Sequence, residues 1–198
     1  LNASTYGYAG GMDYRFAPDS VIGFSLAGGG VNWGLAQGVG NGRSDAFMGG
    51  VYTRSQLGPA YLFGSMAFAN NWFTTNRTAL GDQLQARFEG QSFAARFEAG
   101  YRFALPASFL PSPASGGGLR WATAGVAPYA AVQTQWFHTP AYSETDLTGG
   151  GFGLSYSATT ANDTRSELGA RFDDLWTLAG KPLVLRGQLA WAHDWANT

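Results

Sequence analysis

The hydrophobic residues of this 198-residue chain recur at every second position. The clearest run is Phe93–Phe103, in which aromatic residues and alanine alternate with small or charged residues. Successive side chains on a β-strand point to opposite faces, so the run predicts a strand with one aromatic and one polar face. The same alternation recurs in about eight segments and predicts an all-β, antiparallel sheet. These segments are Thr5–Phe16, Ser20–Asn32, Ala46–Arg54, Pro59–Thr74, Leu84–Phe103, Ala124–Phe137, Arg165–Trp176 and Leu183–Trp195.

The connections between these segments are expected to alternate in length. Outer-membrane β-barrels have short turns on one rim and longer loops on the other, and this alternation matches that asymmetry. One connection, Leu105–Leu119, is long where a short turn is expected, and we interpret it as an extended, proline-stiffened loop. Tight turns are predicted at Ala17–Ser20, Gln56–Gly58 and Gly180–Pro182, and longer loops at Trp33–Ser44, Asn76–Gln83 and Pro140–Thr164.

The charged residues of the predicted strands lie on the face opposite the aromatic residues. In a closed barrel this polar face would line the lumen, whereas in a soluble sandwich it would be the solvated face. The predicted lumen-facing residues are Asp13, Arg15, Arg96, Glu98, Arg102, Gln133, Gln135, Glu167, Arg171, Asp173, Arg186 and Asp194. The predicted lipid-facing or girdle residues are Tyr6, Tyr8, Tyr14, Phe24, Phe68, Trp72, Phe93, Phe97, Tyr101, Trp136, Phe172 and Trp191.

Composition and strand length favour the membrane barrel. Charged residues make up 13% of the chain, against about 25% in an average soluble domain. Aromatic residues make up 15%, and there are 29 glycines. The predicted strands have about 10 residues or more, and a tilted membrane strand needs about 9–11. A glycine-rich soluble β-sandwich remains the alternative at this point.

Several other classes are disfavoured. The net charge of −1 provides no basic surface for nucleic acid. The absence of cysteine excludes disulfides, thiolate zinc sites and cysteine nucleophiles. The uncharged stretch Ser20–Gly42 is long enough for a membrane helix, but its apolar residues alternate, which predicts a strand. The chain opens without a secretory signal and without Met, so we expect a fragment or a processed piece.

No catalytic, cofactor-binding or metal site is predicted. The segment Gly23–Ala27 resembles a nucleophile elbow only loosely, because that motif requires a strand, a turn and a helix. His138 and His193 are the only histidines. Ser143, Glu144 and Asp194 are available near them in principle, but a triad requires mutual hydrogen bonds that the sequence does not reveal.

Four strings, in the right order, resemble the autotransporter β-domain, the translocator of type V secretion. The resemblance covers essentially the whole chain. The strings are Ala9–Tyr14 followed by Ile22 and Gly23, Ala127–Gln133 followed by Tyr142–Glu144, Thr164–Phe172, and Leu189–Trp195.

The resemblance implies a 12-stranded antiparallel meander, a transmembrane β-barrel in the outer membrane of a Gram-negative bacterium. Residues 1–198 would be a partial β-barrel translocator domain with about 8 strands, lacking roughly the first and the last three. Such a barrel anchors or exports a passenger domain in cis. Its implied partners are the lipid bilayer and the outer-membrane assembly machinery, and any enzymatic activity would belong to the passenger. A general outer-membrane channel and a soluble β-sandwich binding module are the alternatives.

Overall fold

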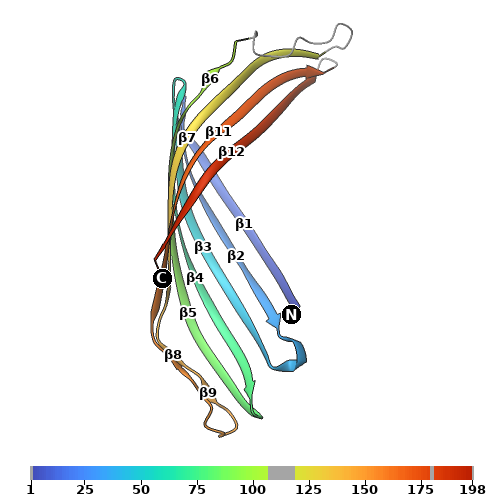
Figure 1. Ribbon diagram of the computed structural model, residues 1–198, viewed down its shortest axis with the longest axis vertical. Coiled ribbons are helices and arrows are strands. Elements are labelled where there is room, and N and C mark those ends of the chain that lie inside the picture. The colour runs from blue at the N-terminus through green and yellow to red at the C-terminus, as the bar shows by residue number, and fades with distance from the viewer. Residues whose placement is uncertain (1, 107–118, 179–180, 198) are drawn as a thin grey trace.

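The computed structural model describes residues 2–106, 119–178 and 181–197, which form one curled antiparallel sheet (Figure 1). Each long strand pairs with the next long strand along the chain, so the topology is a meander. The order of the long strands across the sheet is β1-β2-β3-β4-β5-β7-β11-β12. Their bounds are β1 Asn2–Ala17, β2 Ser20–Gly34, β3 Gly40–Leu57, β4 Ala60–Ala79, β5 Asp82–Tyr101, β7 Leu119–Thr139, β11 Thr159–Leu178 and β12 Lys181–Asn197.

The remaining elements are short. The two-residue strand β6 (Phe103–Ala104) continues the pairing with β7, and a 3₁₀ turn, η1 (Ala36–Gly38), joins β2 to β3. The connection from β7 to β11 contains β8 (Tyr142–Ser143), β9 (Thr145–Asp146) and β10 (Ser155–Tyr156). Strand β10 pairs with β8, and β9 pairs with β5. This connection is therefore ordered against the sheet.

All eight predicted strands are present, and most are longer than the alternation indicated. Strands β4 and β5 have 20 residues each, which corresponds to about 66 Å of extended chain. The Ser20–Gly42 stretch begins with a strand, and no helix among the described residues is long and apolar enough to cross a membrane. Most of the predicted loop Leu105–Leu119 lies outside the described residues.

Two predicted loops are wrong in length. The Asn76–Gln83 segment is not a loop, because β4 and β5 continue to a two-residue turn formed by Leu80 and Gly81. Both residues have positive φ, 51° and 89°, as the favoured type of hairpin turn requires. The connection after β2 is also shorter than predicted, since β3 already begins at Gly40. We call the end of the sheet that carries these connections and β8–β10 the loop end, and the opposite end, with the turns at Pro18-Asp19 and Gly58-Pro59, the turn end.

One face of the sheet is concave. Arg171 on β11 donates a hydrogen bond of 2.8 Å from Nη1 to the hydroxyl of Tyr61 on β4. Three strand spacings separate these strands, about 14 Å on a flat sheet. Side chains converge over such a separation only on the inside of a curve, so we call this side the concave face. A small buried cluster, formed by Tyr61, Ala127, Tyr129 and Ala131, lies on it.

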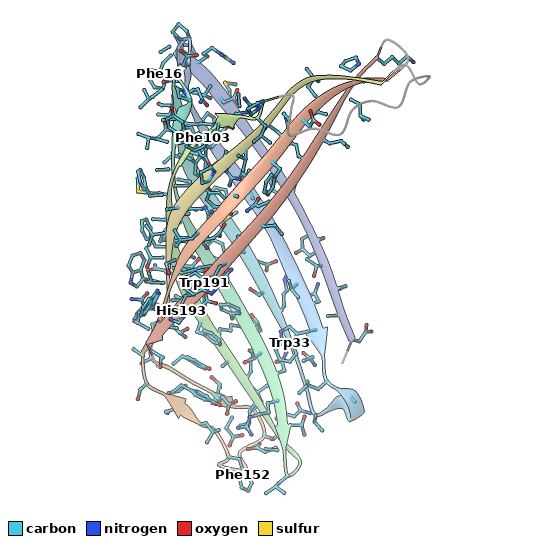
Figure 2. All side chains as sticks on the ribbon, turned by 45° about the horizontal axis from the view of Figure 1, so that its top comes forward. Phe16, Trp33, Phe103, Phe152, Trp191 and His193 are labelled. Carbon is cyan, nitrogen blue, oxygen red and sulfur yellow. The ribbon has the colours of Figure 1, made fainter. Side chains whose placement is uncertain are left out.

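The opposite, convex face carries large exposed hydrophobic side chains. Tyr8, Met12 and Leu189 are 77%, 68% and 71% exposed. Figure 2 shows two of the exposed rings, Phe16 and Phe103, near the turn end. Among the described residues there is no second sheet packed over this face, so the fold is not a β-sandwich.

Candidate functional site

The strand register assigns the predicted polar residues to one face. Residues paired across antiparallel ladders point to the same side of the sheet, and alternate residues along each strand share that side. All the predicted lumen-facing residues lie on the concave face with Arg96, and Arg102 reaches it at the break between β5 and β6. One row crosses all eight long strands, through Asp13, Gly23, Tyr52, Ser65, Arg96, Gln133, Arg165 and Asp194.

Glu98 is the centre of an ionic network on the concave face. Its side chain is 4% exposed. Oε2 accepts hydrogen bonds from Arg96 Nη2 at 2.8 Å and from Arg171 Nη2 at 2.9 Å, while Oε1 accepts from Tyr61 at 2.8 Å and from Arg171 Nη1. Arg96 also contacts Glu167 Oε2 at 3.4 Å. Two carboxylates and two guanidiniums therefore neutralise each other, which is the condition for burying such groups.

Three tyrosines of the concave face each donate a hydrogen bond to a carboxylate, and all three have the same arrangement. Each lies over a glycine directly opposite on the neighbouring strand and donates its hydroxyl to an acidic side chain. The hydroxyl of Tyr61 reaches Glu98 as described. The three sets are Tyr52 over Gly23 with Asp13 at 3.3 Å, Tyr61 over Gly100 with Glu98, and Tyr129 over Gly169 with Glu167.

Two further ion pairs extend the polar face along the strands. Arg102 bonds Asp173 through Nε at 3.0 Å and Nη2 at 2.5 Å, near the turn end. Arg165 bonds Asp194 through Nε at 2.6 Å and Nη2 at 3.0 Å, on β11 and β12.

Other predicted polar residues are not part of the network. Arg15 donates to the carbonyl oxygen of Pro18 at 2.8 Å, and Arg186 has no carboxylate partner among the described residues. Gln133 touches Arg96 only at 3.5 Å.

Sequence reasoning missed several residues of this face. Tyr61, Tyr129, Arg54 and Arg165 contact or adjoin the network but were not predicted there. Parity would have found Tyr129, because it is separated by even steps from Gln133 and Gln135, which were predicted on the polar face.

The convex face carries an apolar belt. All the predicted lipid-facing or girdle residues lie on this face by register. Along β1 the belt runs from Tyr6 to Phe16, ten residue steps or about 33 Å, which spans about 23 Å at a tilt of 45°. The apolar band of outer-membrane barrels is about 25 Å tall.

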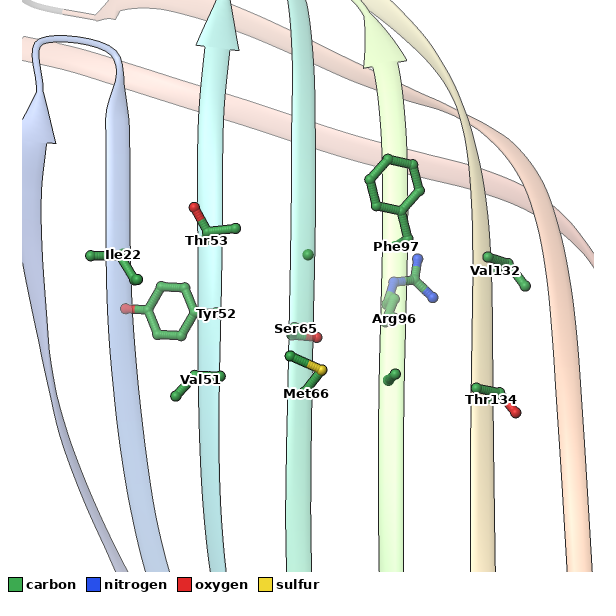
Figure 3. A pocket seen from close by; sticks show the side chains of 12 residues that line it. Ile22, Val51, Tyr52, Thr53, Ser65, Met66, Arg96, Phe97, Val132 and Thr134 are labelled. Carbon is green, nitrogen blue, oxygen red and sulfur yellow. The ribbon is translucent and has the colours of Figure 1, made fainter.

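The middle of the belt is hollowed by small residues. A depression of about 490 Å³ has Gly64 and Ala95 among its lining residues (Figure 3). Larger side chains from five successive strands surround it. These are Ile22, Val51, Met66, Phe97 and Val132.

A polar cluster marks the edge of the belt toward the loop end. Asp45 on β3 accepts a hydrogen bond from Tyr6 at 2.9 Å and forms an ion pair with Arg43 at 2.7 Å. The three side chains lie on the convex face, where Gly30 leaves room between Tyr6 and Asp45. Charged groups of this kind belong outside the hydrocarbon region.

The segment with β8–β10 docks on the extended β4–β5 hairpin at the loop end. Four rings form a continuous stack, with centroid separations of 5.0, 4.0 and 4.7 Å. Arg77 binds Glu144 in a bidentate manner, at 3.0 and 2.6 Å. This bond lowers the pKa of Glu144 and raises that of Arg77. The stacked rings are Phe73, Phe88, Tyr142 and Tyr156.

Two aspartates accept hydrogen bonds from groups of this docked segment. Asp82 is 3% exposed and accepts hydrogen bonds from the Thr148 hydroxyl and from the backbone N–H of Phe152. Asp146 accepts from the backbone N–H groups of Gly151 and Gly149, both at 2.6 Å. These backbone bonds lower the pKa of Asp146 to about 2.

The groups weighed for catalysis are not brought together. His138 bonds Thr160 at 2.9 Å, and His193 lies between Trp191 and Trp195. Each of the three candidate partners is engaged by another residue. Ser143 bonds Ser155, Glu144 bonds Arg77, and Asp194 bonds Arg165.

An antiparallel meander with a charged concave face and an aromatic convex face is the wall of an outer-membrane-type β-barrel. The autotransporter β-domain family model matches residues 1–198, and the chain belongs to this family. Its members are outer-membrane β-barrel translocators that carry a passenger domain.

Solved structures show the same fold. The translocator domain of autotransporter NalP from Neisseria meningitidis has a TM-score of 0.65 at 12% identity, over 95% of this chain and 69% of that one. The β-domain of the Bordetella autotransporter BrkA has a TM-score of 0.67 at 19% identity, over 98% of this chain and 72% of that one. No curated protein matches the sequence.

Proposed function

We propose that residues 1–198 form part of the wall of a translocator barrel in the outer membrane of a Gram-negative bacterium. The concave face lines the lumen, the convex face contacts lipid, and strands beyond these eight close the barrel. The assembly machinery of the outer membrane inserts it, and the passenger domain passes through or out of the lumen. Enzymatic activity, where present, belongs to the passenger.

One observation carries this proposal: the sheet is the inverse of a soluble one. Glu98, a charged residue, is 3% exposed on the inside of the curve, whereas Phe97, the residue before it, is 53% exposed on the outside. Water would favour the opposite arrangement, because exposed aromatic surface costs free energy there. A bilayer around the convex face removes this cost.

The experiment uses the full-length protein in cells. We expect recovery in the outer-membrane fraction and heat-modifiable migration on a gel, as a folded barrel gives. Recovery in the soluble periplasmic fraction would overturn the proposal.

Two adjacent alanines provide a sharper test of which face meets lipid. Ala95 lies on the convex face beside Met66, and Ala94 on the concave face beside Gln135. Ala95→Lys places a charge in the belt and is expected to lower the unfolding free energy by about 2–4 kcal/mol. Ala94→Lys, the matched control, places the same charge in the lumen and is expected to cost much less. Equal costs, or the reverse order, would contradict the assignment of the faces.

A passenger distinguishes this function from that of a general channel. Surface labelling of intact cells should detect sequence encoded upstream of residue 1 outside the outer membrane. A barrel that passes small solutes and displays no upstream sequence would favour the channel.

A further inference from the structure

Three rows of side chains lie on the convex face of β3, β4 and β5, at and beyond the loop-end edge of the apolar belt. Each row crosses these strands because the register pairs β3 with β4 and β4 with β5. The row farthest from the belt consists of amides, and the other two carry charges. The rows are Asn41, Asn76 and Gln85; Arg43, Thr74 and Arg87; and Asp45, Trp72 and Glu89. We call these residues the three-row surface.

Hydrogen bonds across the strands hold the amide row in place. Gln85 donates from Nε2 to Asn76 Oδ1 at 3.0 Å, and Asn76 donates from Nδ2 to Asn41 Oδ1 at 2.9 Å. Within the described part of the chain, the amide nitrogen of Asn41 and the side-chain oxygen of Gln85 have no partner. The row therefore presents a free donor at one end and a free acceptor at the other. A sugar hydroxyl can bond to either group, because it both donates and accepts.

The two arginines of the second row are available to an anion. Arg43 is 59% exposed and bonds Asp45 through Nε at 2.7 Å and Nη2 at 2.9 Å, so Nη1 is left without a described partner. Arg87 is exposed and has no carboxylate partner among the described residues. Thr74 lies between the two arginines, whose backbones are two strand spacings or about 10 Å apart. One ligand lying across β4 can therefore contact both.

The third row places an aromatic ring between two carboxylates. Trp72 is 45% exposed, and its partners across the ladders are Asp45 and Glu89. The C–H side of a sugar ring can bury apolar surface on such a ring, while the carboxylates accept hydrogen bonds from its hydroxyls. The same carboxylates would repel a ligand that was only anionic. The surface therefore fits a ligand that combines sugar with phosphate.

This surface is open and continuous with the belt. The docked segment 140–158 packs on Phe88 and bonds Arg77, which alternate with the row residues and so lie on the other face. The paired belt residues Phe68 and Phe93 follow four residue steps from the third row, about 13 Å along the strands. An amphiphilic molecule can therefore meet the polar rows and the belt at once.

We propose that the three-row surface binds the headgroup of an outer-leaflet lipid that carries phosphate on a sugar, an inference that rests on the proposed function. The loop end meets the outer leaflet, because the longer loops of outer-membrane barrels lie outside. The phosphate contacts Arg43 and Arg87, since a guanidinium fork matches its geometry. The sugar lies on Trp72, and the acyl chains extend over the belt toward the depression at Gly64 and Ala95.

The first test compares three lipids on the purified full-length protein in detergent micelles, with native mass spectrometry as the measurement. Diphosphorylated lipid A carries phosphate on a glucosamine disaccharide. Phosphatidylglycerol carries phosphate without a sugar, and digalactosyldiacylglycerol carries sugar without phosphate. We expect lipid A to bind about tenfold more tightly than either of the others, the effect of one additional charge-assisted hydrogen bond. Equal binding of lipid A and either of the other two would overturn the proposal.

The second test changes the surface. Arg43→Gln combined with Arg87→Gln is expected to weaken lipid A binding about tenfold. Arg87→Gln alone, which breaks no ion pair of the structure, should already weaken it. Trp72→Leu should weaken the binding of lipid A and leave that of phosphatidylglycerol unchanged. Arg54→Gln combined with Arg186→Gln is the matched control, because it removes the same charge from the concave face. Unchanged binding in the first variant, or an equal loss in the control, would overturn the proposal.

Two further measurements separate the possible failures. Inorganic phosphate in excess should not displace lipid A, and displacement that depends on Arg43 and Arg87 would mean that the site binds a free anion and that the proposal is wrong. Heat-modifiable migration reports whether each protein is a folded barrel. Its loss in the unchanged protein counts against the proposed function, whereas a folded barrel that does not distinguish lipid A from phosphatidylglycerol counts against this site alone.

Discussion

The ring of Tyr61 fills the space that a Cβ on Gly100 would need, directly across the β4–β5 ladder. A ring over a glycine of the neighbouring strand shields the exposed backbone there. The absence of a side chain at Gly100 also lets Tyr61 lie against the sheet while its hydroxyl reaches Glu98. The glycine is thus a condition for the ionic network.

Gly100→Ala is expected to destabilise the barrel by about 1–3 kcal/mol, the usual cost of overpacking. The added methyl group displaces Tyr61 and lengthens its bond to Glu98. Urea unfolding of the full-length protein in lipid vesicles measures the cost. Gly10→Ala is the control, because no atom lies within 4 Å of the new Cβ. Combining Gly100→Ala with Tyr61→Ala should remove the clash, so additive costs would contradict this explanation.

Glu98→Gln is expected to lower the unfolding free energy by about 2–3 kcal/mol. The substitution leaves Arg96 and Arg171 without their shared anion in a largely buried position. Asp194→Asn, in a pair whose side chains are both 48% exposed, should cost less than about 1 kcal/mol. The same unfolding measurement compares the two, and equal costs would mean that the Glu98 network does not stabilise the wall.

Acid is expected to release the segment 140–158 from the β4–β5 hairpin. The pKa values of Glu144 and Asp146 are lowered in the folded state, the first by Arg77 and the second by the N–H groups of Gly151 and Gly149. A lowered folded-state pKa means that the stabilisation is complete above the ordinary values of 4.5 and 3.8 and is lost as the pH falls toward about 2. Hydrogen exchange, corrected for intrinsic rates, should therefore accelerate in this segment between pH 5 and pH 2.5, roughly the range in which these carboxylates take up protons.

The strands provide the internal reference for that measurement, because they should remain protected. Asp146→Asn should loosen the segment already at neutral pH. Protection of residues 140–158 that does not change with pH would show that the aromatic stack alone holds them.

Lipids brominated on their acyl chains are expected to quench Trp136 and to spare Trp33. Trp136 is on the convex face against Phe93, whereas Trp33 shares the face of Ala3 and points inward near the loop end. Variants that retain one of the seven tryptophans, the others changed to Phe, allow the comparison by fluorescence. Equal quenching of the two would contradict the assignment of faces.

Much of this fold could be predicted from the sequence, because a strand repeats every two residues. That period predicts where the strands lie, and it places Arg96 and Phe97 on opposite faces of the sheet. It did not reveal that Asn76–Gln83 continues as a hairpin, since polar strand ends outside a membrane look like a loop. It also could not show that Glu144 meets Arg77, 67 positions away, because only the docked loop brings them together.

The tyrosine–glycine pairs were missed for a related reason. Whether Tyr61 faces Gly100 depends on the register between two strands, and a shift of one residue would break the pair. The alternation within a single strand carries no information on that register.

The bond between Arg43 and Asp45 has a consequence for how the protein sits in its surroundings. Moving this ion pair into acyl chains would cost several kcal/mol. We therefore expect the pair to lie outside the hydrocarbon region, on the convex face of β3. The hairpin of β4 and β5 continues well past that level. The edge of the sheet at the loop end is consequently uneven, because β4 and β5 run farther past the level of this pair than β1 and β2 do.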